Sequence, residues 1–290
     1  MSWQNGISGL LSEKFNKKVF INGNRYVGGG SINITRQIFT NVGEFFVKIN
    51  SAERFPRMFE KEAKGLSVLR NASVIDIPEV VGYGENDADA YLVLNFIESG
   101  MEKTGFWENF GRKIALLHKN SDKFFGLDHD NFIGSLPQSN KQHKDWETFF
   151  IKERLLPQIE MARRAGFVDS KFDKLFNGFF KKLPEIFPKE QPALLHGDLW
   201  SGNFMINAKG KPVIIDPAVY YGNREMDLGM SKLFGGFDSA FYAAYHEQYP
   251  LEHGWQQRLD FCNLYPLMVH VNLFGGGYAG SVLQILKKFY

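Results

Sequence analysis

The feature that most constrains the fold is a change of hydrophobic pattern near residue 100. Before it, short runs rich in β-branched and aromatic residues alternate with turn-forming residues, which predicts an antiparallel sheet. These runs are KVFI, ITRQIFT, FFVKIN, IPEVVGYG and AYLVLNFIE. From Lys103 onward, apolar residues recur every three or four positions, which predicts helices. We therefore expect an α+β chain with a small sheet-rich lobe, 1–95, followed by a larger, mainly helical lobe, 96–290.

Composition excludes several classes of protein. A chain of 290 residues with 44% hydrophobic composition can bury a substantial core, and its 34 basic and 32 acidic residues are too balanced for a general nucleic-acid binder. No apolar run approaches the ~18 residues that would predict a membrane span. The single cysteine, Cys262, excludes an intramolecular disulfide, and the first residues lack a signal-peptide pattern, so we expect a cytoplasmic location. Composition does not predict the oligomeric state.

A carboxylate on an apolar helix face is the first candidate functional residue. In RFPRMFEKEAKGLSVLR, Glu62 shares a face with Phe59 and Leu66, whereas Glu60 falls outside this apolar stripe. A buried carboxylate needs a partner. Lys48, in the strand FFVKIN, is the natural candidate, although a lone strand lysine is more often solvated.

A second candidate site lies around HGDLWSGN, residues 196–203. Two short strands, 204–207 and 211–215, are predicted to pair around the turn AKG. The end of the second strand then returns beside the start of the first. Asn203 and Asp216, which flank this hairpin, are therefore expected to converge.

The residue types around this hairpin are those of phosphoryl transfer from ATP. Asn203 and Asp216 offer the oxygen ligands that Mg²⁺ prefers, and Asp198 is placed to accept a proton from a substrate hydroxyl. The alternative interpretation is a set of turn and capping residues. His196 is expected to hold the loop through backbone hydrogen bonds, because no second histidine lies at metal-ligand spacing. Asp227, near a helix start, is expected to support the loop or cap the helix.

A kinase also needs a loop that contacts the phosphates of ATP. GGGSIN, residues 28–33, lies between two predicted strands, and its glycines allow close approach of the backbone to phosphate. Gly28, Gly29, Gly30 and Ser31 are therefore candidate nucleotide-binding residues. The segment lacks the spaced glycines of protein kinases, and a simple turn is the alternative.

Several segments resemble the fructosamine-3-kinase or ketosamine kinase family, which is related to the aminoglycoside phosphotransferases. They are LLHGDLWSGN, IIDPAVYYGNREMDL and LFGGF. Further similar segments follow in the same order across essentially the whole chain: GGGSIN, FFVKIN, MFEKEAKGL, DNFIGSLPQSN, WETFFIKERLLPQ and HVNLFGGGY.

The resemblance implies a two-lobed, protein-kinase-like fold and an ATP- and magnesium-dependent activity. Family members phosphorylate the 3-hydroxyl of ketosamines, the sugar adducts of amines such as protein lysines, and the unstable phosphate then frees the amine. By position, Asp198 would be the base, Asn203 and Asp216 the magnesium ligands, and Lys48 with Glu62 the pair that positions phosphate.

The resemblance also suggests residues for the substrates. Trp200, His270 and Asn272 are candidates for the sugar, although packing explains aromatic and polar residues near glycines equally well. Asn95 and Phe96, at the predicted lobe junction, are candidates for contact with the adenine. Asn95 stands where an acidic residue is expected.

Two other functions remain open. The first is a kinase for another hydroxylated acceptor, such as an aminoglycoside, choline or a sugar. The second is a catalytically silent nucleotide-binding protein. The sequence also leaves open whether a ketosamine acceptor is a free metabolite or a glycated protein lysine. Protein-kinase activity is disfavoured, because no APE-like segment follows Asp216.

Overall fold

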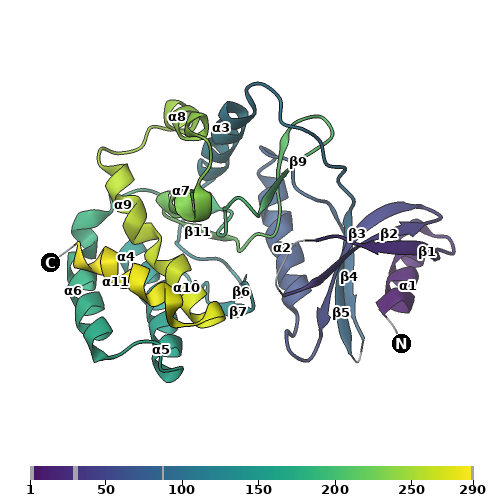
Figure 1. The fold of residues 1–290 in the computed structure, drawn as a ribbon. Coiled ribbons are helices and arrows are strands. Elements are labelled where there is room, and N and C mark those ends of the chain that lie inside the picture. The colour runs from purple at the N-terminus through teal and green to yellow at the C-terminus, as the bar shows by residue number, and fades with distance from the viewer. Residues whose placement is uncertain (1–2, 29–31, 87, 289–290) are drawn as a thin grey trace. The chain divides into compact units, whose positions relative to one another are not determined.

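The computed structural model divides into two compact units (Figure 1). The residues it describes are 3–28, 32–86 and 88–288. Unit 1 comprises Met1–Phe106 and Gly202–Pro217, and unit 2 comprises Trp107–Ser201 and Ala218–Tyr290. These units differ from the expected lobes 1–95 and 96–290, since the first unit extends to Phe106 and takes in a later hairpin.

Unit 1 is built on a five-stranded antiparallel sheet, as its sequence predicts. In spatial order the strands are β1 (Ile21–Tyr26), β2 (Ile34–Thr40), β3 (Gly43–Ser51), β5 (Asp89–Asn95) and β4 (Val80–Glu85). Successive side chains of β3 point to opposite faces. Phe45, Val47 and Ile49 therefore join a buried apolar cluster on one face, which leaves Lys48 on the other.

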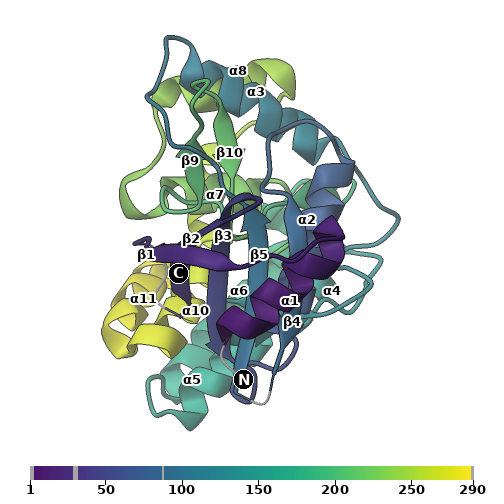
Figure 2. The same cartoon turned by 90° about the vertical axis from the view of Figure 1, so that its right-hand side faces the viewer.

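A helix covers each face of this sheet. Helix α1 (Trp3–Phe15) lies across β4 and β5 (Figure 2) and buries Ile7 and Leu11 in the apolar cluster. Helix α2 (Met58–Asn71) buries the expected stripe that includes Phe59 and Leu66. Because Glu62 lies on α2 and bonds to Lys48, α2 packs on the face opposite α1.

The predicted hairpin is present in unit 1. Strands β9 (Phe204–Ile206) and β10 (Pro212–Ile214) pair antiparallel. Gly100 N donates to Ile206 O at 2.8 Å, and Ile214 N donates to Asp76 O at 3.2 Å. These backbone bonds attach the hairpin to the rest of unit 1.

Unit 2 is mainly helical, which confirms the α+β class. Its helices are α3 (Phe106–His118), α4 (Trp146–Phe149), α5 (Leu156–Arg164), α6 (Ser170–Ile186), α7 (Glu225–Lys232), α8 (Ser239–Gln248), α9 (Trp255–Cys262), α10 (Leu264–Phe274) and α11 (Ala279–Lys287). A π-helical segment, η1 (Phe150–Leu155), joins α4 to α5, and two short 3₁₀ turns are η2 (Leu233–Gly235) and η3 (Gly276–Tyr278). No helix in the described part of the chain is long and apolar enough to span a bilayer.

Two short strand pairs complete unit 2. The first is β6 (Asn131–Ile133) with β7 (Leu136–Gln138), and the second is β8 (Ala193–Leu195) with β11 (Tyr220–Gly222). Because β8 ends at Leu195, it leads directly into the segment 196–201, which we call the Asp198 loop.

Candidate active site

A buried lysine between two carboxylates forms the centre of unit 1. Lys48 Nζ lies 2.6 Å from Glu62 Oε1 and 2.7 Å from Asp216 Oδ1. The pairing with Glu62 is the predicted one, whereas the pairing with Asp216 was not predicted. Glu60, which falls outside the apolar stripe of the same helix, binds Arg57 and Lys64 at the surface.

The charges of this cluster are mutually dependent. Burial lowers the pKa of the Lys48 ammonium, but the carboxylates of Asp216 and Glu62 outweigh this effect, and the pKa rises above its ordinary value. Burial raises the pKa of Glu62, and the charge of Lys48 offsets part of that rise. Lys48 is therefore a fixed cation at neutral pH.

The hairpin brings Asn203 and Asp216 together, as its sequence predicts. Ile215 N donates to Asn203 O at 3.0 Å, so the two ends of the hairpin lie side by side. Asp216 has a left-handed backbone with φ of 56°, which is uncommon for a residue other than glycine. Its side chain is 39% exposed and remains accessible to a ligand.

The donor chemistry of this hairpin fits magnesium. An amide oxygen and one carboxylate are hard ligands, and Mg²⁺ commonly takes one or two carboxylates together with waters and phosphate oxygens. Within the described ranges, no three His, Cys, Asp or Glu side chains gather in the manner of a closed metal site. Asn203 and Asp216 are therefore suited to a metal that arrives with a phosphorylated ligand.

The nucleotide-binding candidates are only partly described. Gly28 is exposed in the connection between β1 and β2, and Val27 N donates to Thr35 O at the base of this connection. Gly29, Gly30 and Ser31 lie outside the described residues.

At the end of β5, the backbone and side-chain amides of Asn95 both bind Glu79, at 2.9 and 3.1 Å. The next residue, Phe96, is half-buried. The side chain of Asn95 is therefore hydrogen-bonded to Glu79 at the end of β5.

In unit 2, Asp227 binds the backbone of the Asp198 loop. Its Oδ2 accepts from His196 N at 2.7 Å, and its Oδ1 accepts from Gly197 N at 2.9 Å. The His196 ring Nδ1 accepts from Asp198 N at 3.3 Å. Of the two roles considered for Asp227, its contacts are those of loop support.

His118 is a contributor that the sequence analysis missed. Its Nε2 lies 3.2 Å from Asp227 Oδ2, and its Nδ1 lies 2.8 Å from the Tyr245 hydroxyl. Burial raises the pKa of Asp227, but His118, His196 and the bound amides outweigh that effect and lower it. The sequence pattern that could have identified His118 is a polar side chain on the apolar face of the helix ending in IALLH, the same kind of pattern that identified Glu62.

Gly197 is required by the close approach of two chain segments. Its φ is 83°, and a Cβ added there would lie 2.0 Å from Ala218 O. Ala218 N donates to His196 O at 2.9 Å, which joins the Asp198 loop to the segment that leads into β11. A side chain at this position would separate the two segments.

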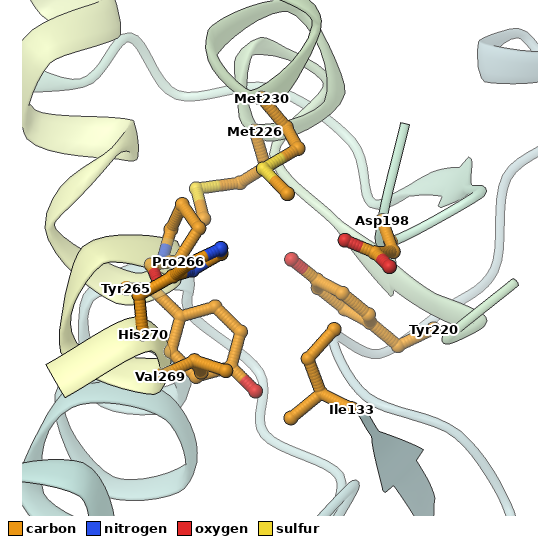
Figure 3. Close-up of a pocket in the computed structure, with 10 residues that line it drawn as sticks. Ile133, Asp198, Tyr220, Met226, Met230, Tyr265, Pro266, Val269 and His270 are labelled. Carbon is orange, nitrogen blue, oxygen red and sulfur yellow. The ribbon is translucent and has the colours of Figure 1, made fainter. Parts of the chain in front are cut away.

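A pocket opens beside Asp198 within unit 2 (Figure 3). We call it the Asp198 pocket, and its lining comprises Ile133, Gly197, Asp198, Tyr220, Met226, Met230, Tyr265, Pro266, Val269 and His270. Figure 3 shows the Asp198 carboxylate and the His270 ring on opposite sides, with the Tyr220 hydroxyl between them. The pocket therefore combines a carboxylate with an apolar, aromatic wall.

The three sugar candidates are placed differently. His270 lines the Asp198 pocket, and its ring centre lies 4.7 Å from that of Phe234, which in turn lies 6.5 Å from that of Trp200. Burial lowers the pKa of His270, so the ring is neutral at neutral pH. Asn272 is not among the lining residues, because its amide donates to Gln158 at 2.7 and 3.0 Å.

Comparison with known proteins gives matches along nearly the whole chain. The model of the family "Fructosamine kinase" matches residues 2–290. The "Probable ketoamine kinase" of Synechocystis sp. is 39% identical over 296 residues, which cover 99% of this chain and 96% of the relative. The "Protein-ribulosamine 3-kinase, chloroplastic" of Arabidopsis thaliana is 39% identical over 268 residues, which cover 91% and 81%.

Solved structures agree with these matches. The crystal structure of the "Putative fructosamine-3-kinase" of Haemophilus somnus 129PT has a TM-score of 0.89 at 30% identity, covering 98% of this chain and 96% of that one. Aminoglycoside phosphotransferase APH(4)-Ia, with a TM-score of 0.62 at 15% identity and 98% coverage of both chains, shares the fold. The chain belongs to the fructosamine kinase family.

Proposed function

We propose that this protein is a ketoamine kinase that transfers the γ-phosphoryl group of ATP to the 3-hydroxyl of a sugar-derived ketosamine. The observation that carries the proposal is the buried cluster of Lys48, Glu62 and Asp216 in a chain that matches the fructosamine kinase family along its length. A buried lysine pre-oriented by carboxylates is the arrangement that kinases use to bind phosphate. The family uses ATP.

Unit 1 supplies the groups that bind ATP. Lys48 contacts the phosphates, and Glu62 fixes the direction of its side chain. Asn203 and Asp216 would hold magnesium, which would supply positive charge beside the phosphoryl oxygens. We assign further ATP contacts to residues 28–31 and to Asn95 and Phe96, so nucleotide binding belongs to unit 1.

Unit 2 supplies the groups that act on the acceptor. Asp198 accepts the proton of the attacking hydroxyl, and the contacts of Asp227 and His196 hold its loop in place. His270 and Trp200 contact the sugar or its amine substituent. Positioning and electrostatics supply most of the rate enhancement, because phosphoryl transfer needs little covalent participation by the protein.

The acceptor class follows from the family. Its relatives include proteins named ketoamine kinase and protein-ribulosamine 3-kinase. We propose that the acceptor is a ketosamine on a small amine or on a glycated lysine, and that breakdown of the 3-phosphate frees the amine. The activity would then repair glycation damage.

The test is ADP release with ATP and magnesium over a panel of ribulosyl, erythrulosyl and fructosyl lysine, an aminoglycoside and choline. We expect turnover on ketosamines, and loss of about 10³-fold or more in Asp198→Asn if that carboxylate is the base. ATP binding should persist in this variant, because Asp198 lies outside the Lys48 cluster. Turnover only on the aminoglycoside or choline would refute the acceptor class, and turnover by Asp198→Asn at the wild-type rate would refute its role.

A further inference from the structure

A buried cation without a carboxylate partner lies behind the Asp198 pocket. Arg154 is fully buried in the π-helical segment η1, and such segments occur frequently at functional sites. Among the described residues, the other buried arginine, Arg224, pairs with Glu190 at 2.6 Å, and the partly buried Arg258 pairs with Glu225 at 2.6 Å. Arg154 forms no ion pair with any of the described residues. Burying a charge unpaired is costly, so its position requires an explanation.

Neutral oxygens and aromatic faces surround the Arg154 guanidinium. Its Nη1 donates to Ser139 O, its Nη2 donates to Asn140 Oδ1 at 2.7 Å, and its buried Nε has no partner in the described chain. The guanidinium carbon lies 4.0 Å from the centre of the Tyr220 ring and 4.5 Å from that of Phe149. The cation therefore acts directly on the aromatic ring of Tyr220.

The same network fixes the backbone that carries Tyr220. Asn140 Nδ2 donates to Asn131 Oδ1 at 3.1 Å, and Asn131 Nδ2 donates to Val219 O at 2.8 Å. Tyr220 itself pairs with Leu195 in the β11–β8 ladder, one residue before the Asp198 loop. Arg154 is thus linked to both the ring and the main chain at this position.

The hydroxyl of Tyr220 is directed toward the Asp198 pocket. Figure 3 shows it on the side of the pocket that holds the Asp198 carboxylate. The other lining tyrosine, Tyr265, donates its proton to Gln138 Oε1 at 2.7 Å. Burial raises the pKa of Tyr220 well above its ordinary value, and Arg154 offsets part of that rise. The phenol therefore remains a proton donor at neutral pH.

We propose that Tyr220 is an acceptor-binding residue, whose phenol hydrogen-bonds a hydroxyl of the sugar chain, and that Arg154 is the positioning residue that fixes this phenol. This inference rests on the proposed ketosamine kinase activity. Asp198 identifies the hydroxyl that reacts, whereas Tyr220 selects for an acceptor with a second oxygen within reach. The Tyr220 hydroxyl also accepts from the Arg154 side chain, which leaves its proton to donate to the acceptor.

The first test compares Tyr220→Phe with Tyr242→Phe. Tyr242 is also buried in unit 2, bonds to Ser231 at 3.1 Å and lies outside the Asp198 pocket. We expect Tyr220→Phe to raise the KM for the ketosamine about 10-fold, the effect of losing one hydrogen bond, with the KM for ATP unchanged. Tyr242→Phe should lower the melting temperature and leave both KM values unchanged. An unchanged ketosamine KM in Tyr220→Phe would overturn the inference.

The second test asks whether Arg154 acts through Tyr220. Arg154→Met and Tyr220→Phe are combined in a double-mutant cycle on the ketosamine KM. We expect Arg154→Met to raise KM in the wild type and to add less than about two-fold in the Tyr220→Phe background. Additive effects would overturn the positioning role. If Arg154→Met does not fold, Arg154→Lys, which keeps the charge but loses the planar fork, replaces it in the cycle.

The controls separate this inference from the function on which it rests. A wild-type enzyme that turns over no ketosamine overturns the proposed function, and the inference falls with it. Ketosamine turnover by the wild type, together with unchanged KM values in Tyr220→Phe, overturns the inference alone.

Discussion

Replacing Asp227 by asparagine should show how strongly the Asp198 loop depends on one buried carboxylate. The side chain of Asp227 accepts from His196 N, Gly197 N and His118, and it is 1% exposed. An asparagine of the same shape must turn its NH₂ group toward at least one of these donors. In the better orientation, the NH₂ group faces Gly197 N alone, and the neutral amide oxygen still accepts from His196 N and His118.

The magnitude follows from these contacts. Loss of one hydrogen bond to a charged acceptor costs about 1.5–3 kcal/mol, and an unsatisfied buried N–H costs a comparable amount. Because the side chain can relax, we expect the free energy of unfolding of unit 2 to fall by about 3 kcal/mol. We also expect kcat to fall about 100-fold, because loss of the Asp227 contacts would displace Asp198, the proposed base, and misplacement of a catalytic group by about 1 Å has that effect.

Tryptophan fluorescence during denaturant unfolding is a suitable assay. Four of the five tryptophans, Trp107, Trp146, Trp200 and Trp255, belong to unit 2. The fluorescence signal therefore reports mainly on the unit that contains Asp227. If the m-values of wild type and variant agree, the difference between their denaturation midpoints measures the change in stability.

The matched control is Asp238→Asn. Asp238 is exposed, and its side chain accepts from Ala240 N as the N-cap of α8, a role in which asparagine and aspartate are equivalent. If Asp227→Asn came within about 0.5 kcal/mol of this control, the argument from buried charged hydrogen bonds would be refuted.

The difference between wild type and Asp227→Asn should also depend on pH. The folded-state pKa of Asp227 is below its ordinary value, so its stabilisation is fully present above that value and is lost as pH falls through the folded-state pKa. The difference should be constant above about pH 5 and shrink below about pH 4.

Two further predictions concern other groups. Glu62→Gln should lower kcat/KM for ATP about 10- to 100-fold in steady-state ADP release, because Lys48 loses one of its two anionic partners. The control Glu60→Gln, on the same helix, should stay within about two-fold of wild type. Equal losses in the two variants would contradict the assignment of Glu62 as the partner of Lys48. Burial lowers the pKa of His270, so the unfolded chain binds the proton more strongly and the free energy of unfolding falls as pH drops through about 6.5 toward the folded-state pKa. The melting temperature of His270→Gln should therefore change less than that of wild type between pH 7 and 5. Parallel curves of melting temperature against pH would contradict the burial effect.

Sequence patterns predicted the parts of the fold that are determined locally. Alternating residues predicted the strands of unit 1, and turn residues predicted the hairpin that brings Asn203 beside Asp216. The three- and four-residue spacing around Glu62 identified a carboxylate that indeed meets Lys48. In each case, the interaction follows from the geometry of one or two neighbouring elements.

Helix α1 could not be predicted in this way. It contains Gly6 and Gly9, which are poor helix formers, and buries only Ile7 and Leu11. The glycine at position 6 is explained by tertiary packing, since a Cβ there would lie 2.8 Å from the Tyr91 ring. Close approach to a distant strand thus outweighs local helix propensity.

Long-range contacts of polar side chains were also beyond the sequence. The contact of Lys48 with Asp216, the partnership of His118 with Asp227, and the network behind Tyr220 each join segments that no periodic pattern relates. Conversely, Asn272 lies one turn from Gly275 in the chain but bonds to Gln158, so its sequence neighbourhood gave no guide to its partner.

The hairpin of unit 1 has a consequence for synthesis of the chain. The sheet strands leave the ribosome first, yet the hairpin 202–217 follows only after residues 107–201, the first segment of unit 2. Until then Lys48 has Glu62 but not Asp216, and both proposed magnesium ligands are absent. A nascent or prematurely ended chain therefore carries the lysine proposed to bind phosphate without the residues proposed to hold magnesium. Both proposed magnesium ligands are thus made between the two segments of unit 2, 107–201 and 218–290, and most of the lining of the Asp198 pocket is made after them.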